Sequence, residues 1–199
     1  MPFALAGLAL AWGVMLLIGG TPTDRDLLEF AYAGGHPGLA FAARWLTELG
    51  GAAILLPVTA LAAAWLAWRR DGRGALLLIA ITLSGRVLVE MQKLLIGRPR
   101  PDSTEHLVMI SNLSFPSAHA ANALMVWLCL AVLLPLGARG RTTAMWAAAT
   151  LALAIGVTRV MLGVHWPTDV IAGWSFGLAW TLLMLRLSGH RLDRPLSSS

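Results

Sequence analysis

Long apolar runs separated by short polar or basic turns dominate this chain. We delimit the runs at about residues 2–20, 51–68, 75–96, 117–136, 143–163 and 167–187. Because a helix that crosses a bilayer needs roughly 20 mostly apolar residues, each run predicts one membrane span. The pattern therefore predicts an all-α, polytopic membrane protein, with a bundle of six transmembrane helices in one domain over residues 1–199.

The stretch between the first two runs differs from the rest of the chain. It carries Asp24, Asp26, Glu29 and Glu48, and such a mixed segment predicts one or two short amphipathic helices at the membrane interface, at about residues 24–49. The first run has no charged residue, so it lacks the basic start of a secretory signal peptide. We expect it to remain as a span.

Composition narrows the classes of protein further. The chain has 199 residues, of which 57% are hydrophobic and 13% charged, whereas soluble domains contain about 25% charged residues. A soluble enzyme and a disordered chain are both disfavoured, because disordered chains are poor in apolar residues. The net charge of +5 does not indicate a nucleic-acid partner, since the arginines lie between apolar runs rather than on a soluble basic patch.

The distribution of arginine predicts which side of the membrane each turn faces. Arginines concentrate at residues 69–73, at residues 139–141 and in the tail from residue 186. Because positive residues favour the cytoplasmic side, we expect both termini to be cytoplasmic in a plasma membrane, the inner membrane of a bacterium. The loops at 21–50 and 97–116 then face the periplasm or the outside of the cell.

Ionisable residues gather at one level of the predicted bundle. Arg86, Glu90 and Lys93 recur at spacings of four and three residues, which places them on one helical face. An interfacial belt of snorkelling side chains would account for any one charged residue, but a converging set inside spans favours a site. The set expected at the outer leaflet comprises Lys93, Arg98, Arg100, His119, Arg159, His165 and Asp169.

Three short segments carry the whole of this set. They are Lys93 to Arg100-Pro101, then Pro116-Ser117-Ala118-His119, then Thr158-Arg159 through His165 to Asp169. Together they resemble the tripartite signature of the phosphatidic acid phosphatase type 2 superfamily, in order and in spacing, over residues 93–169. Ala118 stands where that family usually has Gly, and Thr158 where it usually has Ser, but the backbone N–H and the hydroxyl are both retained.

The residue types suit a phosphate even without the resemblance. Phosphoryl transfer depends on positioning and on fixed positive charge around the phosphate oxygens, and arginine binds phosphate through two N–H groups. The free amides at a helix N-terminus also favour an anion. The predicted phosphate-binding residues are Lys93, Arg100, Ser117, Ala118 and Arg159.

Two histidines are the candidates for the covalent chemistry. His165 precedes Asp169 by one helical turn, so the carboxylate can hold one imidazole nitrogen and leave the other free to attack phosphorus. The resemblance implies the same assignment: His165 as nucleophile, Asp169 as its orienting partner and His119 as general acid. It also implies hydrolysis through a phosphohistidine, with no metal and no cofactor.

Other interpretations of these residues remain open. His119, His165 and Asp169 would suit a metal site, although the neighbouring guanidinium groups would repel a cation. Arg86 and Glu90 are expected to be a buried structural pair. Arg98 is expected either to contact a second phosphate or headgroup or to snorkel. The loop at residues 101–115 is either solvated or serves as a lid or in reading the headgroup.

The sequence as a whole predicts a membrane phosphatase that acts on a lipid phosphate or lipid pyrophosphate at the outer leaflet. The family resemblance implies undecaprenyl pyrophosphate, phosphatidylglycerol phosphate, phosphatidic acid or lipid A phosphates as candidate substrates, and we favour undecaprenyl pyrophosphate or a broad range. The alternatives are a lipid phosphotransferase with the same site and a non-catalytic carrier of anionic lipid. Soluble acid phosphatases and vanadium haloperoxidases share a similar constellation, but the hydrophobic runs argue against them.

Overall fold

The computed structural model describes residues 1–110 and 112–189, and this part of the chain is entirely helical apart from turns and loops. The all-α prediction is therefore confirmed. The helices, in order, are α1 (Pro2–Ile18), α2 (Pro22–Ala31), α3 (Pro37–Glu48), α4 (Ala52–Trp68), α5 (Gly72–Ile96), α6 (Ala118–Leu133), α7 (Ala138–Met161) and α8 (Pro167–Leu187).

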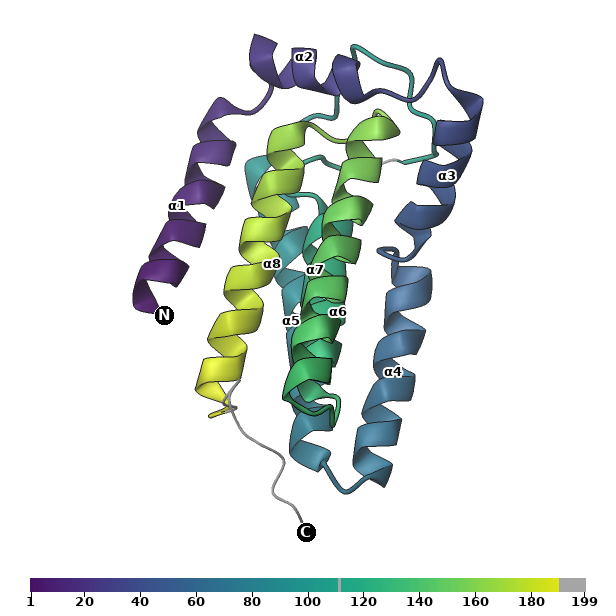
Figure 1. Cartoon of the computed structure of the whole chain (residues 1–199). Helices are drawn as coiled ribbons and strands as arrows, with labels where there is room; N and C mark the ends of the chain where they lie inside the picture. Colours follow the sequence, from purple (N-terminus) through teal and green to yellow (C-terminus); the bar gives the residue numbers. More distant parts are fainter. Residues whose placement is uncertain (111, 190–199) are drawn as a thin grey trace.

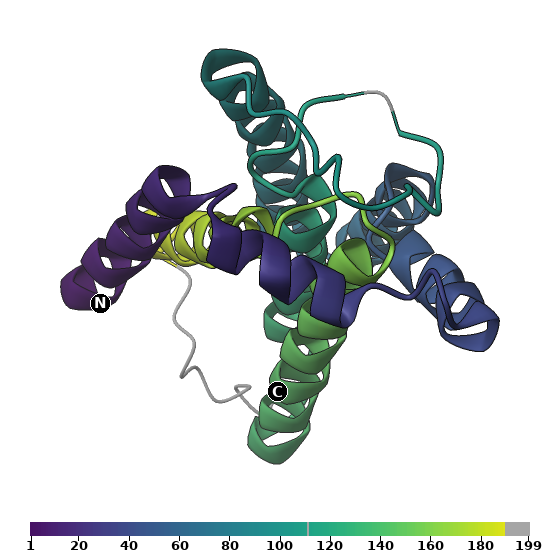
Figure 2. The same ribbon diagram turned by 90° about the horizontal axis from the view of Figure 1, so that it is seen from above.

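The long helices run side by side, with α2 lying across one end of the bundle (Figure 1). We call this the capped end, because α2 and the loop between α5 and α6 cover it, as the view from above shows (Figure 2). Helix α1 begins and helix α8 ends at the opposite end (Figure 1). Helix α6 contacts α4, α5, α7 and α8, and most of its residues are buried.

The described residues contain 4 segments that are long and apolar enough to cross a membrane: residues 37–68 (α3 with α4), α5, α7 and α8. Helices α1 and α2 would supply a fifth span, but they meet at an angle of 97°. Helix α6 is apolar but has only 16 residues. The protein is thus polytopic, whereas the count of six spans stays a prediction.

Several predicted boundaries agree with the structure, and three shift by three residues or more: α5 and α7 begin earlier than predicted, and α6 ends earlier, at Leu133. Helix α8 begins and ends where the apolar run does. Helix α5 begins at Gly72 because Asp71 caps it, accepting a hydrogen bond from the N–H of Gly74 at 2.9 Å. Helix α7 begins at Ala138, so Arg139 and Arg141 lie in its first turns rather than in the preceding turn.

The segment expected at the membrane interface forms two helices, α2 and α3. Helix α3 continues with α4 as one apolar segment of 32 residues, so it is not set apart from the bundle as a short interfacial helix would be. The interfacial position of α2 stays a prediction.

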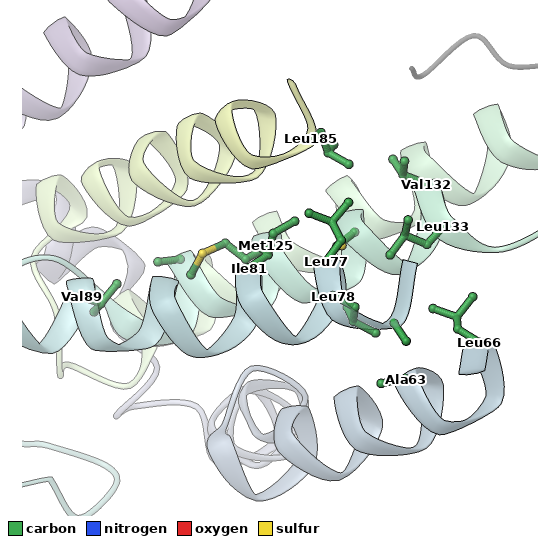
Figure 3. Close-up of a cluster of buried hydrophobic side chains, with 13 residues drawn as sticks. Ala63, Leu66, Leu77, Leu78, Ile81, Val89, Met125, Val132, Leu133 and Leu185 are labelled. Carbon is green, nitrogen blue, oxygen red and sulfur yellow. The ribbon is translucent and has the colours of Figure 1, made fainter. Parts of the chain in front are cut away.

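The largest apolar cluster joins α4, α5, α6 and α8 (Figure 3). Ile81 of α5 and Met125 of α6 are fully buried at its centre, and Leu185 of α8 is 2% exposed. Because lipid tails are as apolar as leucine, such contacts hold membrane helices together through close packing rather than through exclusion of water.

Two glycines of α8 allow it to approach α6 closely. A Cβ atom at Gly173 would lie 2.6 Å from the carbonyl oxygen of Ser117, and one at Gly177 would lie 2.6 Å from that of Ala121. This is the geometry that a G-x-x-x-G spacing permits. It brings the first turn of α8 against the start of α6, where the N–H of Ser117 donates to the backbone oxygen of Asp169 at 3.0 Å.

Candidate active site

A single polar cavity of about 150 Å³ gathers five of the predicted site residues. Its wall includes the two histidines and three predicted phosphate ligands, contributed by α5, the α5–α6 loop, the first turn of α6 and the α7–α8 loop. These residues are Lys93, Arg100, Ala118, His119 and His165. Ser117, Arg159 and Asp169 are buried and do not line the cavity.

His165 lies in the short loop between α7 and α8, and its side chain is almost completely buried. The loop turns at Gly163, whose φ of +73° is favourable for glycine. Nδ1 of His165 is 3.4 Å from Oδ2 of Asp169. The structure therefore brings together the two residues that their spacing predicted to pair.

Ser114 also contacts both members of this pair, and no pattern in the sequence indicates it. Its hydroxyl donates to Oδ2 of Asp169 and lies 3.4 Å from Nδ1 of His165. The N–H of Trp166 donates to the same carboxylate oxygen at 3.0 Å. A neutral serine one turn before a helix carries no charge or periodicity signal, so only its place before Pro116 in the segment could have drawn attention.

Arg98 holds the other oxygen of the carboxylate. Its Nη1 donates to Oδ1 of Asp169 at 2.8 Å and to Oγ1 of Thr168 at 3.3 Å. Its Nη2 donates to the carbonyl oxygens of Leu16 at 2.7 Å and Met15 at 3.2 Å. Both expectations for Arg98, a phosphate contact and snorkelling, are wrong, because the carboxylate and the end of α1 occupy the guanidinium.

The same network reaches the corner between α1 and α2. Oδ2 of Asp24 accepts from the hydroxyl of Thr168 at 2.6 Å, and Oδ1 accepts from the N–H of Thr168 at 3.1 Å. Asp24 also accepts from the N–H of Gly20 at 2.9 Å. The corner of α1 and α2 is thereby fixed to the residue next to Asp169.

Arg100 lies on the opposite side of the imidazole from Asp169. Its Nη1 is 3.2 Å from Nε2 of His165, and its Nε donates to the backbone oxygen of Asn112 at 2.7 Å. A guanidinium has donors only, so this contact requires Nε2 to be the acceptor and places the ring proton on Nδ1. The free electron pair of Nε2 then points to the side of the ring where Arg100 lies.

The electrostatic environment keeps His165 neutral. Burial lowers the pKa of its imidazole well below the usual 6.5, and the positive charges of Arg100, Arg159 and Lys93 lower this pKa further. Burial also lowers the pKa of Arg100, to about 10, with Asp169 and Glu90 acting in the opposite direction. At neutral pH the site therefore combines a neutral imidazole with a charged guanidinium.

The remaining predicted phosphate ligands are buried near this wall. The Nζ of Lys93 is 3.9 Å from Oε1 of Glu90. The Nη1 of Arg159 donates to the hydroxyl of Thr47 at 3.0 Å. Within the described part of the chain, Nε of Arg159 and Oγ of Ser117 are buried without a hydrogen-bond partner.

The prediction that Arg86 and Glu90 form a buried pair is wrong. The side chain of Glu90 is 54% exposed, and the ion pair it forms is with Lys93, three residues further along α5. Arg86 and Glu90 both line the cavity. A residue on a helical face can pair with the residue one turn before it or one turn after it. The spacing alone therefore did not show whether Glu90 would pair with Arg86 or with Lys93.

The break between α3 and α4 forms the wall beside His119. A Cβ atom at Gly50 would lie 2.5 Å from Cγ2 of Ile155 and 3.2 Å from the backbone oxygen of His119. A Cβ at Gly51 would lie 3.6 Å from Nε2 of His119. The two glycines let this junction approach the start of α6, a role that a Gly-Gly pair inside an apolar run could have suggested.

The loop at residues 101–110 packs beside the α7–α8 loop. A Cβ at Gly163 would lie 2.8 Å from the backbone oxygen of Glu105, and the N–H of Leu107 donates to the carbonyl oxygen of Leu162 at 3.0 Å. Nε2 of His106 is 2.8 Å from the backbone oxygen of Pro101. This loop is therefore attached to the fold rather than simply solvated.

Comparisons with known proteins point to one family. The family model described as "PAP2 superfamily" matches residues 74–193. The chain is 35% identical over 137 residues to phosphatidylglycerophosphatase B of Bacillus subtilis (strain 168), which covers 67% of each protein. It is 32% identical over 165 residues to decaprenylphosphoryl-5-phosphoribose phosphatase of Mycobacterium tuberculosis (strain CDC 1551 / Oshkosh), covering 78% of this chain and 84% of that protein.

A solved structure shows the same fold. It is the crystal structure of a transmembrane PAP2-type phosphatidylglycerolphosphate phosphatase from Bacillus subtilis, with a TM-score of 0.85 and 29% sequence identity. The similarity covers 96% of this chain and all of that one. The likeness therefore includes α1 and α2, which lie before the residues that the family model matches.

Proposed function

Because this chain belongs to the PAP2 superfamily, we propose that it is a membrane phosphatase that removes the terminal phosphate of a lipid phosphate or lipid pyrophosphate. One observation carries the proposal: His119 and His165 line the same small cavity as Lys93 and Arg100. Its cationic wall suits the equatorial oxygens of a phosphoryl group in transfer. One imidazole can then attack phosphorus, and the other can protonate the leaving oxygen.

In this proposal the phosphate is bound by Lys93, Arg100 and the backbone N–H of Ala118 at the start of α6. Arg159 and Ser117, which are buried near the cavity, add unpartnered polar atoms that can turn toward the bound anion. Arg100 exchanges its contact with the imidazole for the phosphate oxygens.

The reaction proceeds in two displacements. Nε2 of His165 attacks phosphorus while the bond between phosphorus and the lipid oxygen breaks, and His119 donates a proton to that oxygen. Water then attacks the phosphohistidine, His119 accepts a proton from it, and the phosphorus–nitrogen bond breaks. Inorganic phosphate leaves, and both histidines return to their starting states.

The cations around the cavity provide the charge that a metal ion supplies in other phosphatases. Lys93 and Arg100 line the cavity with the two histidines, and Arg159 lowers the pKa of His165 from nearby. Such a site opposes the binding of a further cation. We therefore propose hydrolysis without a metal or another cofactor.

The same proposal covers membrane topology. We infer six spans, with α6 as a short span and α1 as the first, and the capped end at the outer leaflet of a bacterial inner membrane. The basic residues at the opposite end support a cytoplasmic position of that end and of both termini, namely Arg69, Arg70, Arg73, Arg139, Arg141 and Arg186. Arg191 and Arg194, which the same prediction uses, lie outside the described residues.

The test is a phosphate-release assay with the purified protein in detergent, across phosphatidic acid, phosphatidylglycerol phosphate, undecaprenyl pyrophosphate and lipid A. We expect release from at least one lipid, unchanged rates in EDTA, and loss of release in His165→Ala. The matched control is His106→Ala, since His106 is exposed and bonded within its loop.

The outcomes separate the competing functions. Lipid binding without release of phosphate would favour a carrier, and transfer of the phosphate to an added lipid alcohol in preference to water would favour a phosphotransferase. Loss of activity in EDTA that is restored by a divalent cation would overturn the metal-free mechanism.

A further inference from the structure

The cavity continues past the residues assigned to the terminal phosphate. On α5, Glu90 and Arg86 line it one and two turns from Lys93, about 4.5 Å and 10.5 Å along the helix axis toward the opposite end. On α6, Asn122 lines it one turn beyond His119 in the same direction. We call Arg86, Glu90 and Asn122 the inner residues of the cavity.

Asn122 is a buried polar residue whose amide oxygen lacks a partner within the described residues. It is 4% exposed, and within the described part of the chain its Oδ1 has no hydrogen-bond partner. An unpaired polar atom among apolar helices is costly. Asn122 lies on the cavity wall rather than in apolar packing, so a ligand can supply the missing donor.

We propose that the inner residues are a subsite for the leaving group, and that they select lipids in which hydroxyl-bearing carbons separate the terminal phosphate from an inner phosphodiester. This inference rests on the proposed function, because the cavity must first hold a phosphomonoester at its cationic end. It adds to that function a class of substrate and three residues that choose it.

The order of the residues along the cavity supports this assignment. His119 delivers its proton to the leaving oxygen, and Asn122 lies one turn away on the same face of α6. A hydroxyl next to the leaving oxygen therefore meets Oδ1 of Asn122 and the carboxylate of Glu90, which both accept hydrogen bonds. Arg86, one turn further along α5 than Glu90, faces the next phosphate with a positive charge.

A lipid pyrophosphate fits this order less well. Its two phosphorus atoms share one bridging oxygen, so the second phosphate would lie at the level of Glu90 and Asn122. There it would meet the carboxylate of Glu90, which repels it. The inner residues thus disfavour the pyrophosphate substrate that the sequence alone favoured.

Three lipids with identical acyl chains test the proposal. They are phosphatidylglycerol phosphate, its analogue with propane-1,3-diol in place of the bridging glycerol, and diacylglycerol pyrophosphate. With the wild-type protein we expect kcat/KM to be about tenfold higher for the hydroxyl lipid than for its deoxy analogue, the size of one buried hydrogen bond. We expect diacylglycerol pyrophosphate to be the poorest substrate.

Variants assign the effect to residues. Asn122→Ala should lower the ratio of kcat/KM for the hydroxyl lipid to kcat/KM for the deoxy lipid from about ten to about one. Glu90→Gln should raise kcat/KM for the pyrophosphate lipid relative to kcat/KM for the other two lipids. The matched control is Gln92→Ala: Gln92 also lies on α5 but donates to the carbonyl oxygen of Leu88 at 3.0 Å and does not line the cavity, so both ratios should stay unchanged.

Equal kcat/KM values for the hydroxyl and deoxy lipids with the wild-type protein would overturn the proposed subsite. An Asn122→Ala variant that lowers these two kcat/KM values by the same factor would also overturn it. The wild-type comparison and Glu90→Gln decide the question if Asn122→Ala does not fold. Absence of phosphate release from all three lipids and from phosphatidic acid would overturn the proposed function instead.

Discussion

The two sides of the candidate site differ in how completely their polar groups are satisfied. On the α8 side, both oxygens of Asp169 are engaged, by Arg98, Ser114, Trp166 and His165. On the α6 side, Oγ of Ser117 and Oδ1 of Asn122 are buried without partners in the described part of the chain. Of the residues on these two sides, only His165 and Asn122 line the cavity itself. We call the two sides the fixed wall and the open wall.

The difference indicates that the two walls have different functions. A nucleophile gains from being held in one orientation and one tautomer before the substrate arrives, which is the task of a surrounding hydrogen-bond network. A wall that binds and protonates a leaving group must keep donors and acceptors free for the ligand. The fixed wall should therefore control kcat for every substrate, and the open wall should distinguish one substrate from another.

The histidines offer the largest test of this comparison. His165→Ala should lower phosphate release by about 10⁴-fold or more for any lipid, because the nucleophile is lost. His119→Ala should lower it by about 10²- to 10⁴-fold for alkyl phosphates, but much less for an aryl phosphate lipid, since a phenolate leaves without a proton. Equal losses of His119→Ala on both leaving groups, measured as single-turnover rates, would contradict its role as general acid.

Substitutions at Asp169 and Arg98 should have the next largest effects. Asp169→Asn should lower kcat by about 10³- to 10⁴-fold, as the wrong imidazole tautomer does in other triads. It should also destabilise the protein, because it leaves Arg98 buried without its anionic partner.

The double variant Asp169→Asn with Arg98→Gln should recover thermal stability in detergent but not activity. Arg139→Gln, at the opposite end of the bundle, is the matched charge control. A double variant as unstable as the sum of its single changes would show that the ion pair does not couple the two residues.

Ser114→Ala should have a smaller effect, about tenfold on kcat with KM nearly unchanged, because one hydrogen bond to the Asp169 carboxylate is lost. Ser114→Thr, which retains the hydroxyl, should recover part of the rate. A change confined to KM would place Ser114 with the substrate rather than with the imidazole.

The pH dependence should show the smallest effect. His165 must be unprotonated to attack, and its pKa is lowered by burial and by the nearby cations, so kcat/KM should fall only well below pH 6.5. Loss of the Arg100 charge in Arg100→Gln should move this acidic limb to higher pH. An acidic limb at or above pH 6.5 in the wild type would contradict a neutral His165.

The sequence predicted the helices well because apolar runs and turn residues are local signals. The bounds of α8 agree fully with its run, and the start of α7 differs because arginines can extend a helix beyond the apolar core. The number of spans was harder to predict, because α6 is short and α1 meets α2 at 97°. Hydropathy does not report either property.

Lys93, Arg100, His119 and His165 line one cavity, and the sequence predicted that they would gather because each carries charge or belongs to a spaced motif. Their roles in the reaction stay predictions. Ser114 and Asn122 could not be found in this way, because a neutral side chain acquires its role only from the helix packed against it. The role of Arg98 was mistaken for the same reason. Its spacing from Lys93 places it near the site, but its partners lie on α8 and at the end of α1.

The contact between Arg98 and α1 has a consequence for biosynthesis. Helix α1 is made before α8, yet the carbonyl groups of Met15 and Leu16 in the last turn of α1 and the carboxylate of Asp169 share one guanidinium. The hydrogen-bond support of the His165 imidazole is therefore complete only after α8 has been made. Under the proposed mechanism, the nascent chain would hold its cationic residues before it holds a competent nucleophile, and hydrolysis would begin only once α8 is in place.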